Sequence, residues 1–200
     1  MPTRYEAADR RTGKLIRQNR AEFHNLRLRF PFDYLNVAGV KREVKAMYGR
    51  MEKRNRAVYI DIAMAVYADL SESEAAALVD GVLSAYDPVT GYVYTREISR
   101  KRDRTAEGML AAASRSALSA SVERSRRLWE TQSLQFADEV VDAAMLRKFR
   151  DAGVTRVKWI SVEDESRCGR CADLHGRIFK IDEIPAKQHL HCRCYVVPVE

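Results

Sequence analysis

The chain has 200 residues, of which 46% are hydrophobic and 32% charged, so it can bury a core beneath a strongly charged surface. Its formal net charge of +7 allows contact with nucleic acid or with an acidic protein surface. No apolar run is long enough to span a bilayer, and the first residues lack a signal-peptide pattern. We therefore expect a soluble protein that is made in the cytoplasm and has no membrane partner.

The charge is distributed unevenly along the chain. Residues 1–56 contain fifteen Lys or Arg and six Asp or Glu, whereas residues 57–95 contain six acids and no Lys or Arg. A basic N-terminal arm followed by an acidic segment indicates either an anionic partner for the arm or pairing of the two segments within the fold. The plainer alternative is a solvated helix face, which is what a run of charges commonly forms.

The first 95 residues are predicted to be helical. Residues 4–29 carry widely spaced apolar side chains among arginines, which is typical of a helical arm with little core of its own, and Pro31 interrupts it. From Val40 the apolar residues recur at three- and four-residue steps, which predicts a long amphipathic helix ending near Leu70. The sequence Ser71-Glu-Ser-Glu74 then has the pattern of a capping box and predicts the start of a shorter helix.

Helix is also expected in the second half of the chain. Residues 92–94 form either a short extended piece or the start of the next helix. Residues 106–121 are rich in Ala and Ser, which lets helices approach closely, so we place them inside a bundle. A helix over residues 122–149 is expected to break near Thr131-Gln-Ser133, and Gly153 fits a helix end that takes a positive φ.

After that glycine the hydrophobic period becomes alternating. Strands are predicted at residues 154–162, 177–181 and 195–199. Trp159 is interpreted as the apolar plug of this small sheet, and Pro198 confines the last strand to an edge because proline has no N–H to donate.

All four cysteines lie in this C-terminal part, as Cys168-Gly-Arg-Cys171 and Cys192-Arg-Cys194, with His189 shortly before the second pair. Thiolate and imidazole groups presented on two turns are the ligands of a tetrahedral zinc site. The alternatives are two disulfides or four unrelated thiols. A chain with no secretory signal gains little from disulfides crowded at one end, so zinc is the favoured interpretation.

The ligand set is only partly fixed by the spacing. A Cys-x-x-Cys turn aims Cys168 and Cys171 at one point, whereas the two thiols of the Cys-x-Cys pair share one face of a strand. Two assignments remain open: both thiols of the second pair complete the site, or His189 does so with only one of them. His175 and His191 are weaker candidates.

The predicted zinc is structural rather than catalytic. Glu163, Asp164 and Asp173 are near in sequence, but no HExxH or HxE signature accompanies them. A thiolate-rich ligand set favours a closed site that staples a small β-module with too little apolar surface to fold alone. No catalytic triad, P-loop or dinucleotide fingerprint is present, so no enzymatic activity is predicted.

Several of these features form one ordered series, and they resemble the C-terminal signature of the phage Mu F-like minor head proteins. The resemblance covers roughly the last 60 residues and departs from the family at Leu190-His191, where Pro-Asn is frequent. The residues that carry it are Val157-Lys-Trp159, Asp164, Cys168-Gly-Arg-Cys171-Ala-Asp-Leu-His-Gly176, Pro185 and His189-Leu-His-Cys192-Arg-Cys194.

The resemblance implies a non-enzymatic minor component of a tailed-phage head. Such proteins associate with the portal or the inside of the capsid, so the expected location is the virion and the expected partners are the portal protein and other head proteins. Together with the periodicity, this predicts an α+β fold. A mostly helical body with long helices, residues 1–153, precedes a zinc-stapled β-module, residues 154–200.

The alternative function is a zinc-dependent nucleic-acid-binding protein that acts on packaged or ejected DNA. It is motivated by the net charge and by basic clusters at Arg10-Arg11, Arg100-Lys-Arg102 and Arg126-Arg127. Acids are interleaved with these clusters and no aromatic ladder accompanies them, so the support for non-specific DNA contact is weaker.

Overall fold

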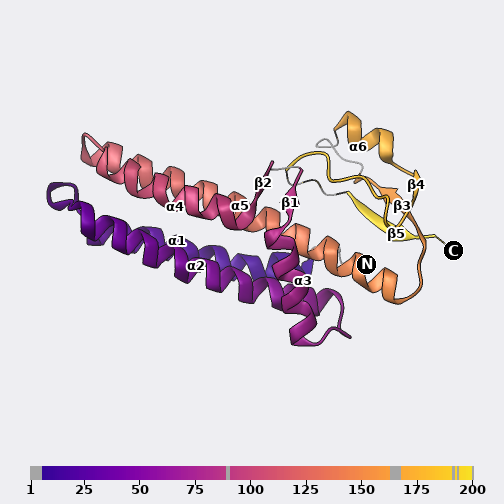
Figure 1. Ribbon diagram of the computed structural model, residues 1–200. Coiled ribbons are helices and arrows are strands. Elements are labelled where there is room, and N and C mark those ends of the chain that lie inside the picture. Colours follow the sequence, from indigo (N-terminus) through magenta and orange to yellow (C-terminus); the bar gives the residue numbers. More distant parts are fainter. Residues whose placement is uncertain (1–5, 89–90, 163–167, 191, 193, 200) are drawn as a thin grey trace.

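The computed structural model describes residues 6–88, 91–162, 168–190, 192 and 194–199. Long helices form an elongated bundle, and a small sheet lies at one end of it (Figure 1), which confirms the predicted α+β class. The helices are α1 (Glu6–Arg29), α2 (Val37–Val66), α3 (Glu72–Ser84), α4 (Tyr94–Leu110), α5 (Arg115–Asp151) and α6 (Gly169–Leu174), with a 3-10 turn η1 (Phe32–Tyr34). The strands are β1 (Tyr86–Asp87), β2 (Tyr92–Val93), β3 (Arg156–Ile160), β4 (Ile178–Lys180) and β5 (Tyr195–Pro198).

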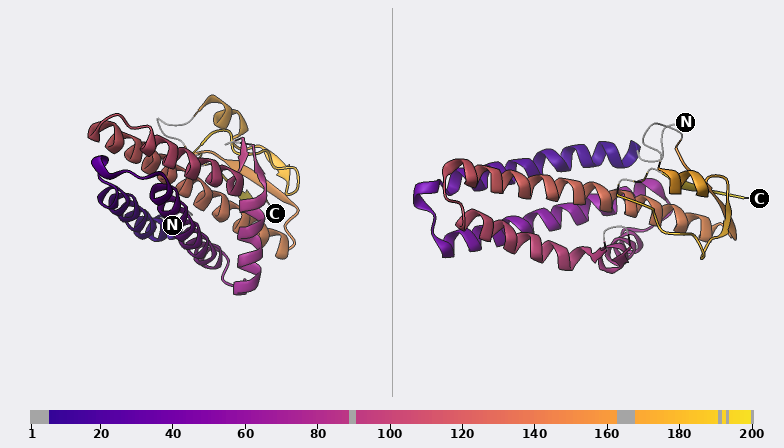
Figure 2. Two further views of the ribbon diagram at one scale, coloured as in Figure 1. Left: turned by 60° about the vertical axis from the view of Figure 1, so that its left-hand side comes forward. Right: turned by 90° about the horizontal axis from the view of Figure 1, so that it is seen from above.

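Helices α1, α2, α4 and α5 run side by side along the bundle, as the views in Figure 2 agree. The expectation that α1 is an arm with little core of its own is wrong. One face of α1 is fully buried, and two of its members, Thr12 and Asn19, are polar. Thr12 Oγ1 donates to the carbonyl of Ala8 at 2.8 Å, and Asn19 Nδ2 donates to Asn55 Oδ1 at 3.1 Å. Because hydrogen bonds satisfy these groups, they can lie in the core beside Leu15.

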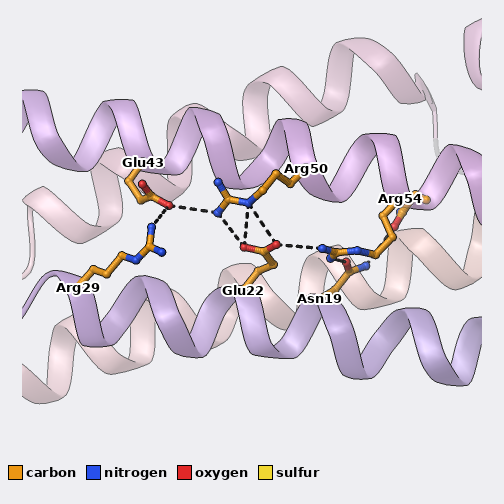
Figure 3. Close-up of polar contacts among 7 residues, drawn as sticks. Asn19, Glu22, Arg29, Glu43, Arg50 and Arg54 are labelled. Carbon is orange, nitrogen blue, oxygen red and sulfur yellow. Dashed lines mark hydrogen bonds and ion pairs between the residues drawn. The ribbon is translucent and has the colours of Figure 1, made fainter.

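Some arginines of the basic start of the chain form ion pairs within the bundle. Figure 3 shows a ladder between α1 and α2, in which Glu22 accepts from Arg50 at 2.8 Å and from Arg54 at 3.1 Å. Glu43 continues the ladder by accepting from Arg29 at 2.7 Å. This ladder joins α1 to α2 and lies within residues 1–56, so it is not the expected pairing of the basic arm with the acidic segment. That pairing is represented by Arg56, which donates to Asp80 at 2.7 Å.

The helix starts follow the local sequence. Asn36 caps α2 by accepting from the Gly39 N–H at 2.6 Å, and the capping box of Ser71 and Glu74 at the start of α3 is confirmed. Helix α2 ends at Val66, slightly before the predicted end. None of the described helices has an apolar stretch that could cross a lipid bilayer.

Helix α5 is continuous, so the predicted break near residues 131–133 is wrong. Ser133 is buried, its Oγ accepts from Asn55 Nδ2 at 2.8 Å, and its carbonyl accepts from the Tyr59 hydroxyl at 2.8 Å. These polar groups therefore form hydrogen bonds between α2 and α5, and α5 continues through them. The real interruption lies earlier, after Leu110, where Ser114 caps α5 by accepting from the Ala117 N–H.

The C-terminal strands lie where the alternating pattern predicts them, and they form an antiparallel sheet in the order β4-β3-β5. Gly153 has a φ of 74° and ends α5, as expected. Pro198 lies on the edge strand β5 opposite Val157 of β3, where no further strand needs its missing N–H. Trp159 is 2% exposed and fills the space between the sheet and α5, which confirms its role as an apolar plug.

Candidate metal centre

The cysteine cluster is built by α6 and the segment that leads into β5. Cys168 is the N-cap of α6, and its Sγ accepts from the Cys171 N–H at 3.4 Å. This short helix turns Cys171 inward, so that its side chain is buried beside the buried thiols of Cys192 and Cys194. The return segment closes with a turn in which the Cys192 N–H donates to the His189 carbonyl. Helix α6 itself is absent from the sequence prediction, which has only a turn there.

The sulfur and nitrogen atoms have the separations that a bound metal requires. Cys171 Sγ lies 3.6 Å from Cys192 Sγ and 3.5 Å from His189 Nε2. A tetrahedral zinc with Zn–S bonds of about 2.3 Å holds two sulfurs about 3.8 Å apart, and a sulfur and a nitrogen about 3.6 Å apart. A disulfide needs about 2.05 Å, and all four cysteines are unbridged. The geometry thus fits a metal and not a disulfide.

Two overlapping groups of side chains could hold the ion, and Cys171 belongs to both. One group is Cys168, Cys171 and His189, and the other is Cys171, Cys192 and Cys194. Within each group the ligand atoms lie within 4.8 Å of one another. Each of the five predicted ligands belongs to at least one of these groups, and Cys171 is the residue that links the two.

A main-chain contact prepares His189 to act as a ligand. Its Nδ1 lies 2.9 Å from the Leu190 carbonyl oxygen, which can only accept a hydrogen bond. The proton of a neutral imidazole is therefore placed on Nδ1, and the lone pair of Nε2 is left facing Cys171. A hydrogen bond of this kind on the outer nitrogen is the usual support for a metal-ligating histidine.

The protein environment acts differently on the individual thiols. Burial raises the pKa of the Cys171 thiol and that of the Cys194 thiol. At Cys168 the main-chain N–H of Cys171 donates to the sulfur and lowers the pKa. A metal binds thiolates and not thiols, so it must displace protons from the buried sulfurs, and its affinity falls as the pH falls.

The remaining predicted candidates are not part of this cluster. His175 is exposed, and its Nδ1 lies 3.0 Å from the Ser161 hydroxyl. Asp173 is exposed on α6. His191, together with Glu163 and Asp164, lies outside the described residues.

The comparisons with known proteins agree with this architecture. The family model of "Phage Mu protein F like protein" matches residues 96–197, which is half of the chain. The chain belongs to this family. The match begins in α4 and so extends well beyond the cysteine signature, taking in all of α5, β3 and β4 and most of β5. No curated protein and no solved structure shows a significant match to the chain. Membership of the Mu F-like family indicates a phage head protein, found in the virion and in contact with other head proteins.

One residue of this Mu F-like protein that the motifs do not reveal holds the cluster against the bundle. Lys187 Nζ lies 3.0 Å from Asp142 Oδ2 on α5 and donates to the carbonyls of Cys192 and Cys194. A cavity of about 210 Å³ lies beside this contact and is lined in part by Trp159 and Glu139. A single lysine in a loop has no sequence pattern that distinguishes it from a solvated one.

The basic clusters that motivate DNA binding are partly neutralised by neighbouring acids. Arg126 pairs with Glu123 and Glu130, and Arg127 pairs with Glu123. Lys101 is half-buried, with its Nζ 5.9 Å from the centre of the Tyr92 ring. Charges engaged in this way are poor contacts for phosphate, which weakens the alternative function.

Proposed function

We propose that this protein is a non-enzymatic minor head protein that docks on the portal at the inside of the phage head. The observation that carries the proposal is the family match over residues 96–197, which spans most of α4, all of α5 and the cysteine cluster. A rigid helical body with a compact module at one end suits an adaptor between head components. Assistance with DNA packaging or ejection is a further part of this proposal.

We further propose that the module is held by one structural zinc ion, bound by Cys168, Cys171, His189 and Cys192. The group of Cys168, Cys171 and His189 supports three of these ligands, and the 3.6 Å separation of Cys171 Sγ from Cys192 Sγ supports the fourth. Cys194, which belongs to the group of Cys171 and Cys192, is the competing fourth ligand. Four protein ligands that include buried thiolates leave no place for a reacting water. We infer two units accordingly, a body of residues 1–153 and a zinc-bearing module of residues 154–200.

The docking proposal is tested on heads and on the purified portal oligomer of the same phage. We expect the protein in a few copies per head, and we expect the free protein to co-sediment with the portal oligomer in physiological salt. Its absence from heads, or failure to bind the portal while binding free DNA with a steep salt dependence, would overturn the proposal in favour of the nucleic-acid alternative.

A further inference from the structure

The end of the bundle farthest from the sheet carries an exposed apolar group. Leu28, Tyr34 and Val37 are 64%, 77% and 59% exposed, and they lie at the connection between α1 and α2. Figure 1 places this connection at the left-hand end of the bundle, beside the connection between α4 and α5 and opposite the sheet. We call these two connections with their flanking residues, 27–42 and 104–115, the distal tip.

The distal tip is held in place by contacts beneath its exposed side chains. Phe30, Phe32 and Leu35 pack against the bundle core. Asp33 in η1 forms an ion pair with Arg115 at the start of α5, which joins the two connections. The exposed side chains are therefore presented on an ordered support, and holding them there on binding costs little additional ordering entropy.

The surroundings of these apolar side chains are positively charged. The distal tip contains six Lys or Arg and two Asp or Glu. Arg27, Lys41 and Arg42 are exposed and make no ion pair with any residue that the structure describes. This differs from the neighbouring stretch of α1 and α2, where the cations are engaged in the ladder of Figure 3. The distal tip thus combines free positive charge with apolar anchors.

We propose that the distal tip docks on an acidic protein surface of another head component and inserts Tyr34 and Leu28 into an apolar recess there. The proposal rests on the proposed function and adds the docking face and the chemistry of its partner. An aromatic anchor surrounded by charge is typical of protein interfaces. DNA phosphates would pair with the cations but leave the apolar side chains in water. A bilayer would require a long apolar helix face, and α1 and α2 bury theirs in the bundle.

A photo-crosslinking amino acid placed at single tyrosines tests this docking in assembled heads. p-Benzoylphenylalanine replaces Tyr34 in one variant and Tyr86 in the other. Tyr86 is a matched control because it is 65% exposed on β1, away from the distal tip. The heads are assembled in cells whose only copy of the gene carries the substitution, and the crosslinked peptides are identified by mass spectrometry.

We expect a crosslink from position 34 to an acidic segment of another head protein, at least tenfold above the yield from position 86. The double variant Leu28→Ser/Tyr34→Ser should enter heads at least tenfold less than Tyr86→Ser, with an unchanged circular dichroism spectrum. Equal yields from both positions, or a crosslink from position 34 to DNA, lipid or a second copy, would overturn the docking face while leaving the proposed function intact. Absence of the wild-type protein from heads would refute both the docking face and the proposed function.

Discussion

Lys187 and Asp142 form a largely buried ion pair between the C-terminal module and α5, with side chains 12% and 19% exposed. The same ammonium donates to the carbonyls of Cys192 and Cys194, so one side chain satisfies a carboxylate of the bundle and the backbone of the cysteine segment. The position of the cluster therefore depends on a cation that is not a metal ligand.

Lys187→Met should destabilise the protein by about 3 kcal/mol, because it leaves the Asp142 carboxylate buried without its partner. The free energy of unfolding, measured by denaturant titration, checks this value. Lys180→Met is the matched control, since Lys180 pairs with Glu183 on the surface and is 72% exposed. Its effect should stay below about 0.5 kcal/mol. A similar small loss in Lys187→Met would contradict a structural role for the buried pair.

Removal of the metal should unfold the module but not the bundle, because the two hydrophobic clusters are separate. We expect one zinc per chain, loss of near-ultraviolet signal from Trp159 on chelation, and retention of most helical signal. An unchanged spectrum with freely titratable thiols would refute the metal centre.

The cysteine variants distinguish the two possible ligand sets. Cys171→Ser and Cys192→Ser should each abolish stoichiometric zinc binding, because the two sulfurs are in contact at 3.6 Å. Cys194→Ser should retain the metal, and His189→Ala should weaken binding at least tenfold. If Cys192→Ser and Cys194→Ser both lose zinc while His189→Ala keeps it, both thiols of the second pair complete the site. If Cys194→Ser loses zinc and Cys192→Ser keeps it, the fourth ligand is Cys194.

The C-terminal module is predicted well from sequence because its constraints are local. Metal-ligand spacing brings Cys168 and Cys171 together whatever the rest of the chain does. Alternation places the strands, Gly153 supplies a conformation that other residues avoid, and Pro198 must lie at an edge. Each of these signals is contained within a few residues.

The bundle is predicted less well because its polar core is satisfied only across helices. Asn19 in α1 and Ser133 in α5 appear polar and therefore exposed in sequence, but both are buried around Asn55. Asn19 and Ser133 lie 36 and 78 residues away from Asn55 in the sequence, so no local pattern reveals these contacts. The role of Lys187 could not be predicted for the same reason, because its acceptors become neighbours only in the folded chain.

Asn55→Ala should therefore be strongly destabilising, although it replaces a polar residue in a helix. The substitution leaves the side-chain amide of Asn19 and the hydroxyl of Ser133 buried without their Asn55 partner. We therefore expect a loss of about 2–3 kcal/mol in the free energy of unfolding. Asn25→Ala on the exposed face of α1 is the control and should change stability by less than about 0.5 kcal/mol. Equal effects of the two substitutions would mean that the buried network adds no stability.

Two acids near the C-terminal module, Asp138 and Glu139, should make the protein less stable as the pH rises. Burial raises the pKa of Asp138 to about 7, with Asp142 and Asp9 raising it further and Lys187 lowering it. Burial also raises the pKa of Glu139 to about 7, with Asp87 and Asp142 raising it and the hydrogen bond from Gln135 lowering it. In the unfolded chain both groups titrate near pH 4.

Between about pH 4 and pH 7 the folded state consequently binds more protons than the unfolded state, so these two acids lower the stability as the pH rises. The double variant Asp138→Asn/Glu139→Gln should remove this loss and be more stable than the wild type at pH 8 by on the order of 2 kcal/mol. The advantage should be smaller at pH 5 and should vanish below about pH 4, where these acids are protonated in both the folded and the unfolded wild type. Denaturant titrations of both proteins at matched pH cancel the titration of every other group, including the thiols. Asp182→Asn is the control for removal of an exposed carboxylate, because the Asp182 side chain is 79% exposed, and it should change stability by less than about 0.5 kcal/mol. A double variant that is less stable than the wild type at pH 8 would show that the two carboxylates are compensated in the fold and that burial does not dominate their ionisation.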